Sequence, residues 1–195
     1  MKNKEKNKQI MKDSVDAILS GITGVSVAWG ICKAFFGAGL KLRQNRVIEW
    51  AEMIKNNPGI FVNEVTETEE FQDGFVYILE KYIRERNDRK RKHIQSVFMN
   101  FTTSKNKIDF ELEKLMYTLS QITEQDIECL KYVSVKSISS YQIFDDQKFL
   151  SNIYNLINLG ILYVDPTPRV GPIESPFVYT SNFGRRFIQY IKYEK

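Results

Sequence analysis

The sequence is poor in the residues that catalytic and metal sites most often use. Its 195 residues include one histidine, His93, and two cysteines, Cys32 and Cys129, whose spacing is not that of metal ligands. It also lacks a glycine-rich phosphate loop, a nucleophile elbow and an HExxH motif. A lone histidine in a basic segment is more often a surface residue than a general base. We therefore expect a protein that is not an enzyme, with no catalytic residue, cofactor or metal.

Cysteine is too scarce for a disulfide framework. Cys32 and Cys129 both lie in apolar helical segments, which is typical of buried thiols that pack as small hydrophobic side chains. No small-residue cleavage pattern follows the apolar segment near the N-terminus, so a cleavable signal peptide is not predicted. These absences favour a cytoplasmic protein, with membrane association through that segment as the alternative.

A strong net charge is absent as well. The chain has 28 Lys and Arg residues against 24 Asp and Glu, a formal charge of +4, which is compatible with nucleic acid or anionic lipid but does not require either. Lysines crowd the start of the chain, and residues 1–12 are predicted to form a basic flexible tail. Apolar residues are abundant, at 43% of the chain, which is enough for a sizeable core.

Residues 15–40 contain only two charged residues, Asp16 and Lys33. The apolar residues of this segment are spaced by threes and fours, which predicts one amphipathic helix ending at a glycine cap near Phe35–Gly39. They are Val15, Ile18, Ile22, Val25, Trp29, Cys32 and Phe36. We favour a face that packs within the protein or against a partner. A transmembrane helix would carry Lys33 at a cost of about 2.5–3.5 kcal/mol, and attachment to a membrane surface is the third interpretation.

The middle of the chain is predicted to be helical with a basic interruption. A helix over residues 42–55 ends at Asn56–Gly59, and a long helical region follows, with one apolar face before residue 84 and another after residue 93. Between those faces lies a candidate contact for nucleic acid or another anion, without aromatic or large apolar residues. Its basic residues are Arg84, Arg86, Arg89, Lys90, Arg91 and Lys92. We favour a solvated helix, or a joint near Asn87–Asp88, with ion pairs such as Glu85 with Arg89.

The last third carries the clearest structural pattern. A helix over residues 149–158 is predicted to stop at Leu159–Gly160, followed by a strand (161–164), a loop rich in proline and glycine, a second strand (177–179) and a terminal helix. Two helices precede them. The first carries apolar residues from Phe110 to Ile122, and the second starts at the N-cap Thr123 and continues through Ile127, Leu130, Tyr132 and Val133. This order predicts a winged helix.

The predicted fold class is therefore mainly α. A helical part over residues 13–105 is followed by a winged-helix-like module, with a small β-hairpin, over residues 108–195. The helix over residues 149–158 stands where a DNA-binding winged helix places its recognition helix. Asp145 and Asp146 at its start would repel phosphates, whereas asparagines at 152, 155 and 158 could read adenine. Basic contacts would come from Arg169, Arg185 and Arg186; we favour packing or protein contact over DNA.

Three short motifs resemble a known family. They are L-S-Q-I-T-E-Q-D-I at 119–127, N-L-I-N-L-G-I-L at 155–162 and Y-T-S-N-F-G-R-R-F at 179–187. With the apolar N-terminal stretch and the basic helix, their order resembles the abortive-infection-alpha-like group of bacterial and prophage proteins, whose C-terminal pattern is N-L-x-x-L-G-L-I followed by T-x-x-G-x-x-F. The resemblance implies a bacterial accessory or phage-defence protein and supplies no catalytic residue. The chain lacks the acidic patch that precedes the basic helix in that group.

Three functional hypotheses follow. The first is a non-enzymatic bacterial interaction protein, associated with phage defence or a mobile element, that acts through protein–protein contacts or self-association. The second is a DNA-binding winged-helix regulator. The third is a membrane-associated effector that uses the helix of residues 15–40. No small-molecule substrate is indicated.

Overall fold

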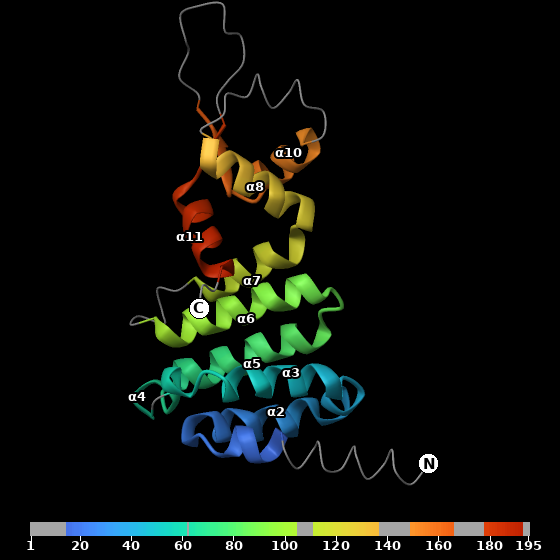
Figure 1. Ribbon diagram of the computed structural model, residues 1–195, viewed down its shortest axis with the longest axis vertical. Helices are drawn as coiled ribbons and strands as arrows, with labels where there is room; N and C mark the ends of the chain where they lie inside the picture. Colours follow the sequence, from blue (N-terminus) through green and yellow to red (C-terminus); the bar gives the residue numbers. More distant parts are fainter. Residues whose placement is uncertain (1–14, 62, 105–110, 137–148, 166–177, 193–195) are drawn as a thin grey trace, which may run out of the picture. The chain divides into compact units, whose positions relative to one another are not determined.

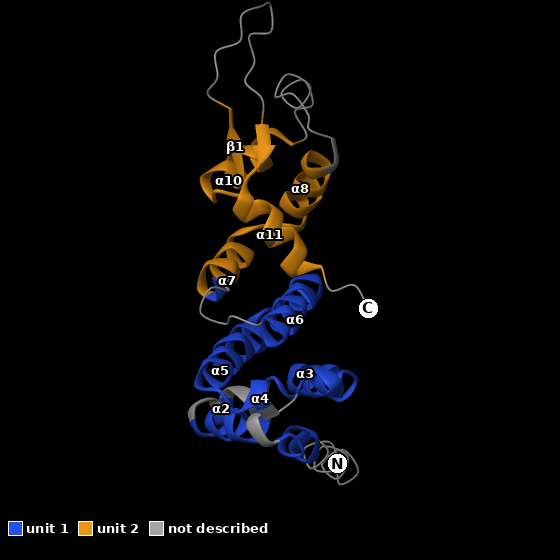
Figure 2. Cartoon of the chain, turned by 90° about the vertical axis from the view of Figure 1, so that its left-hand side faces the viewer, with its two compact units in different colours: residues 1–112 blue, residues 113–195 orange. Residues whose placement is uncertain are grey.

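A computed structural model describes residues 15–61, 63–104, 111–136, 149–165 and 178–192. These residues are mainly helical and include one two-stranded antiparallel sheet (Figure 1). The chain divides into two compact units, Met1–Leu112 and Glu113–Lys195, here called unit 1 and unit 2 (Figure 2). The predicted tail, residues 1–12, and the predicted boundary between residues 105 and 108 lie outside the described residues.

The described part of unit 1 is helical. Residues 15–20 belong to a helix. It is followed by α2 (Thr23–Leu42), α3 (Gln44–Lys55), the 3-10 turn η1 (Pro58–Ile60), α4 (Asn63–Thr66), α5 (Glu69–Arg84) and α6 (Asp88–Thr103). The side chain of Thr68 caps the start of α5 by accepting a hydrogen bond from the N–H of Phe71 at 3.2 Å. At the other end of α5, Arg46 donates to the carbonyl oxygen of Ile83 at 2.6 Å and so satisfies a carbonyl of the last turn.

The apolar segment 15–40 contains two helices, so the prediction of a single helix was wrong. The chain bends at Gly21–Ile22, and the indole N–H of Trp29 donates to Asp16 at 2.7 Å. In one straight helix those two residues would lie about 20 Å apart along the axis, so this bond requires the chain to turn back. The predicted end at Phe35–Gly39 was also wrong, because α2 continues to Leu42. Packing of α2 against α5 outweighs the unfavourable effect of glycine inside a helix.

The predicted apolar face of this segment is largely inside unit 1. Val15, Val25, Trp29 and Cys32 are buried, Ile18 and Ile22 are half-buried, and the side chain of Phe36 lies outside the described residues. The Lys33 ammonium lies 3.2 Å from the Asp16 carboxylate, so the two charged residues of the segment pair with each other. Among the described helices, none combines the length and the hydropathy that crossing a bilayer requires.

Aromatic rings form the centre of unit 1. Trp50 on α3 is fully buried, and its ring lies 4.6 Å from Phe98, 5.0 Å from Tyr82 and 6.0 Å from Phe75, measured between centroids. The predicted face of α3 (Val47, Trp50, Ala51 and Ile54) is buried, which confirms the helical period there. α5 approaches α6 closely at Gly74, because a Cβ there would overlap the ring of Phe101.

In the described part of unit 2, three helices precede the sheet and one follows it. They are α7 (Leu112–Gln121), α8 (Glu124–Lys136) and α10 (Leu150–Asn158), then β1 (Leu162–Val164), β2 (Val178–Thr180) and α11 (Asn182–Ile191). β1 and β2 pair in antiparallel register, with Tyr163 opposite Tyr179. The core includes Leu115, Leu119, Ile127, Leu130, Ile153, Leu156 and Phe187. Tyr132, expected on the apolar face of α8, is 40% exposed, and its ring lies against Phe149 instead.

The predicted end of α10 at Leu159–Gly160 is confirmed. Gly160 adopts φ +69°, and the N–H of Ile161 donates to the carbonyl of Leu156 at 2.9 Å, the bond that closes a Schellman motif. This cap turns the chain directly into β1. The first turn of α11 then lies so close to Ile161 that a Cβ at Gly184 would overlap the Ile161 carbonyl oxygen.

Candidate functional site

The basic segment 84–92 contains a joint between two helices, as one of the two favoured interpretations predicts. α5 ends at Arg84 and α6 begins at Asp88, with Asn87 as its N-cap. The Asn87 side chain accepts hydrogen bonds from the N–H groups of Arg89 and Lys90, at 2.9 and 3.1 Å. Glu85 accepts from the N–H of Asn87 at 2.7 Å. The predicted ion pair of Glu85 with Arg89 is not formed.

Arg91 is the buried member of the basic segment, with a side chain only 11% exposed. Its guanidinium lies 2.8 Å from Asp88 and 3.3 Å from Glu49 on α3, and it also donates to the carbonyl of Arg86 at 3.3 Å. Glu49 accepts a second hydrogen bond, from the Tyr82 hydroxyl at 3.0 Å. Arg91 therefore links α3, the end of α5 and the start of α6. Its guanidinium is occupied by partners inside unit 1, so it is not available to an external anion.

The pKa directions agree with this arrangement. Burial, followed by the hydrogen bond to Glu49, raises the pKa of Tyr82. Burial alone would lower the pKa of Arg91, but the charge of Glu49, the hydrogen bond to Tyr82 and the charge of Asp88 outweigh it, so the pKa is raised. The network therefore holds a charged arginine and a neutral tyrosine across the neutral pH range.

The other basic residues of the segment differ in their surroundings. Arg84 pairs with Glu80 at 2.8 Å, one turn earlier on α5, and Lys90 is half-buried. Arg86, Arg89 and Lys92 are exposed, and their side chains have no acidic partner among the described residues. We call these three residues the basic joint. Of the six predicted anion contacts, they are the ones that present an unpaired charge to solvent.

Unit 2 is organised around one buried carboxylate, Asp126 on α8, which is 2% exposed. It caps its own helix, because it accepts hydrogen bonds from the N–H and the hydroxyl of Thr123 at 2.6 and 2.8 Å. It also accepts from the side-chain amides of Asn152 and Asn155 on α10, at 2.8 and 3.1 Å. Two of the three asparagines proposed as readers of adenine are therefore bound inside the unit, and only Asn158 is exposed.

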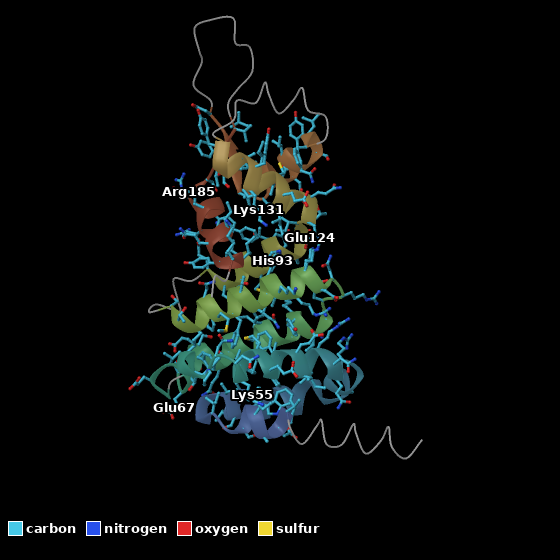
Figure 3. The ribbon with its side chains drawn as sticks, in the orientation of Figure 1. Lys55, Glu67, His93, Glu124, Lys131 and Arg185 are labelled. Carbon is cyan, nitrogen blue, oxygen red and sulfur yellow. The ribbon has the colours of Figure 1, made fainter. Side chains whose placement is uncertain are left out.

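The remaining predicted basic contacts of unit 2 are dispersed. Arg169 lies outside the described residues. Arg185 donates to the carbonyl of Thr180 at 3.3 Å and to the side chain of Asn182, so it folds back on the start of α11 (Figure 3). Arg186 is exposed on the same helix. The described residues of α10 carry no basic side chain.

Exposed aromatic residues are the feature of unit 2 that the sequence reasoning missed. The described part of unit 1 has one large hydrophobic side chain that is exposed, Val27, whereas the described part of unit 2 has five. The five are Tyr117, Tyr132, Tyr154, Tyr163 and Val164. Tyr163 is 47% exposed and stacks across the strands on Tyr179, with ring centroids 5.7 Å apart. The signal that could have found Tyr154 is its spacing, since it falls on the side of α10 opposite the buried Ile153 and Leu156.

The residues with side chains that commonly bind metals are dispersed in the described part of the chain. No set of three or more His, Cys, Asp or Glu side chains is placed there to hold a metal ion. Burial raises the pKa of Cys32 to about 12, and burial followed by the charge of Asp126 does the same for Cys129. Both are free, buried thiols, as predicted. His93 on α6 is half-buried (Figure 3).

Comparisons of the chain with family models, with curated proteins and with solved structures found no match. The resemblance to the abortive-infection-alpha-like group therefore stays a prediction, and function has to be argued from the geometry above.

Proposed function

We propose that this protein is a non-enzymatic interaction protein, whose unit 2 is a winged-helix-like module that binds protein and does not read DNA. The observation that carries the proposal is the stacked pair of Tyr163, which is exposed, and Tyr179, which is half-buried, on the β1–β2 ribbon. Tyrosine is enriched in protein interfaces because it contributes a large contact area and a polar tip with little conformational entropy. A ribbon that carries such a pair is suited to a partner surface.

The winged-helix assignment rests on the order of the elements. Among the described residues of unit 2, three helices, an antiparallel ribbon and a final helix come in that order, with the turn from α10 into β1 made by the capped Gly160. Protein binding is favoured over DNA reading because α10 directs Asn152 and Asn155 into the unit, toward Asp126. Base recognition requires side chains that reach base edges, and these two amides are already bonded.

A second copy of the chain is the partner that the ribbon favours. Within the described residues the sheet has two strands, so each strand has an outer edge without a partner strand. A twofold contact places the same patch of both copies together, so the aromatic pair of one chain meets that of the other.

The test is sedimentation velocity over a range of protein concentration. Wild type is expected to form a dimer that dissociates on dilution. Tyr163→Glu is expected to sediment as a monomer throughout, because it places two like charges across the twofold axis. Tyr117→Glu is the matched control, since Tyr117 is 62% exposed but lies on α7, and it should dimerise like wild type. A monomeric wild type, or equal loss in both variants, would refute the proposal.

We propose phage defence as the biological setting, on the support of the sequence motifs at 119–127, 155–162 and 179–187. The test compares phage plating on bacteria that express wild type, Tyr163→Glu or no protein. Reduced plating with wild type, restored by Tyr163→Glu, is expected. Equal plating on all three strains would remove this setting while leaving the self-association measurement unaffected.

A further inference from the structure

The basic joint of unit 1 carries positive charges that are not paired with acidic residues in the described part of the chain. Residues 84–92 contain six basic and two acidic residues, a net charge of +4, equal to the net charge of the whole chain. Both acidic residues are engaged locally: Asp88 lies 2.8 Å from Arg91, and Glu85 accepts from the N–H of Asn87. Arg86, Arg89 and Lys92 are left exposed without acidic partners among the described residues.

The buried network holds the backbone of the joint, from which these cations extend. Arg91 holds the start of α6 against Glu49 on α3, and Asn87 caps the first turn of α6. The amide groups of Arg89, Lys90 and Arg91 in that turn are therefore already bonded, so an external anion would mainly meet side chains. Arg89 and Lys92 are three residues apart on α6, which places them as neighbours on one helix face.

The composition of the joint selects among anionic partners. Guanidinium groups match phosphate oxygens with two parallel hydrogen bonds, and two of the three residues are arginine. Residues 84–92 contain no aromatic side chain for stacking on the bases of a single strand. They also contain no large apolar side chain that would enter a lipid surface. Of the three anionic partners considered, single-stranded nucleic acid, a lipid surface and a duplex, the joint fits best the phosphates of a duplex, contacted without reading of the base sequence.

We propose that the basic joint, Arg86, Arg89 and Lys92, binds the phosphate backbone of double-stranded DNA independently of base sequence. This site lies on unit 1 and does not depend on the self-association proposed for unit 2. It differs from a winged-helix DNA contact, because α10 and the wing take no part in it.

The test is fluorescence anisotropy with labelled DNA duplexes of two unrelated sequences, over a range of salt concentration. Wild type should bind both duplexes equally. Three phosphate contacts give a slope of log K against log salt of about −2.7, which is a loss of affinity of roughly 40-fold between about 50 and 200 mM salt. The variant R86A/R89A/K92A should lose this binding and its salt slope.

A matched variant removes the same charge elsewhere. Lys55 on α3, Lys131 on α8 and Lys192 after α11 are exposed lysines outside the joint (Lys55 and Lys131 in Figure 3). K55A/K131A/K192A should keep the wild-type salt slope, and circular dichroism should show both variants folded. Absence of duplex binding by wild type, equal loss in the two variants, or binding to anionic vesicles but not to duplex would each overturn the proposal.

Discussion

The two units bury opposite charges, and in each unit that buried charge determines what remains at the surface. Unit 1 buries the cation Arg91, which pairs with Asp88 and Glu49. Those two acids are therefore not available to Arg86, Arg89 and Lys92, which have no acidic partner among the described residues. Unit 2 buries the anion Asp126 among amides, and this uses Asn152 and Asn155. Four of the five exposed large hydrophobic residues in its described part are tyrosines. Surface chemistry in this protein therefore follows from internal hydrogen bonding.

The two buried charges differ in how much solvent reaches their partners. Glu49 and Asp88, the partners of Arg91, have side chains that are 47% and 81% exposed. Asp126 is itself buried, and of its partners Asn152 is buried and Asn155 half-buried, whereas Thr123 is exposed. Water screens an exposed ion pair but not a buried carboxylate. The comparison thus predicts that unit 2 depends on its buried charge more than unit 1 does.

The largest effect is expected for Asp126→Ala. It removes the cap of α8 and leaves the buried amide of Asn152 without its acceptor, so we expect a loss of about 3–5 kcal/mol in the free energy of unfolding. Urea denaturation followed by hydrogen exchange would measure the loss and place it in unit 2. A loss below about 1 kcal/mol would show that Asp126 does not organise the unit.

The next largest losses of stability are expected at the two glycines that lie close to a neighbouring segment, Gly184 and Gly74. Gly184→Ala should destabilise by about 3 kcal/mol, because its Cβ would meet the rigid carbonyl oxygen of Ile161. Gly74→Ala should destabilise by about 1 kcal/mol, because the ring of Phe101 can shift and alanine favours the helix. Chemical denaturation of both variants checks the order. The predicted order is wrong if Gly74→Ala lowers the free energy of unfolding more than Gly184→Ala does.

Arg91→Met should have a smaller effect than Asp126→Ala. It removes the guanidinium from Glu49 and Asp88, but both acids can be hydrated, so we expect a loss of about 1–3 kcal/mol. Chemical denaturation under the same conditions as for Asp126→Ala would compare them directly. If Arg91→Met were the more destabilising of the two, the proposed difference between the units would be wrong.

At neutral pH the smallest effect is that of thiol ionisation, and it grows as the pH rises. Cys32 and Cys129 ordinarily titrate near 9.0, but burial raises the pKa of each to about 12 in the folded protein. Their contribution to stability is therefore fully present below about pH 9 and is lost as the pH rises toward about 12. The double variant Cys32→Ala/Cys129→Ala should lose less stability than wild type between neutral and alkaline pH, in urea denaturation at each pH. An unchanged alkaline slope would contradict this.

The sequence predicted what local spacing controls. The periodic apolar residues of α3 identified its buried face, and Thr123 followed by Asp126 marked the start of α8. Both signals act over a few residues, within one helix. The mainly helical fold with a small antiparallel sheet was predicted for the same reason.

Contacts between distant residues could not be predicted in this way. The six basic residues of segment 84–92 look alike in sequence, and Glu49, 42 positions before Arg91, is the distant partner that distinguishes the buried one. Asn152 and Asn155 looked like base readers because their acceptor, Asp126, lies 26 and 29 positions earlier. The bend at Gly21–Ile22 depends likewise on the bond of Trp29 to Asp16. Each error concerns a polar partner that the fold supplies.

The central claim is that the two units carry two separate surfaces, a basic one and an aromatic one. The most direct test is sedimentation velocity of wild type, Tyr163→Glu and R86A/R89A/K92A, each with and without labelled duplex. We predict that Tyr163→Glu remains monomeric but binds the duplex, and that R86A/R89A/K92A dimerises but does not bind it. A variant that lost both dimerisation and duplex binding would contradict the account. So would a result in which both variants kept both properties.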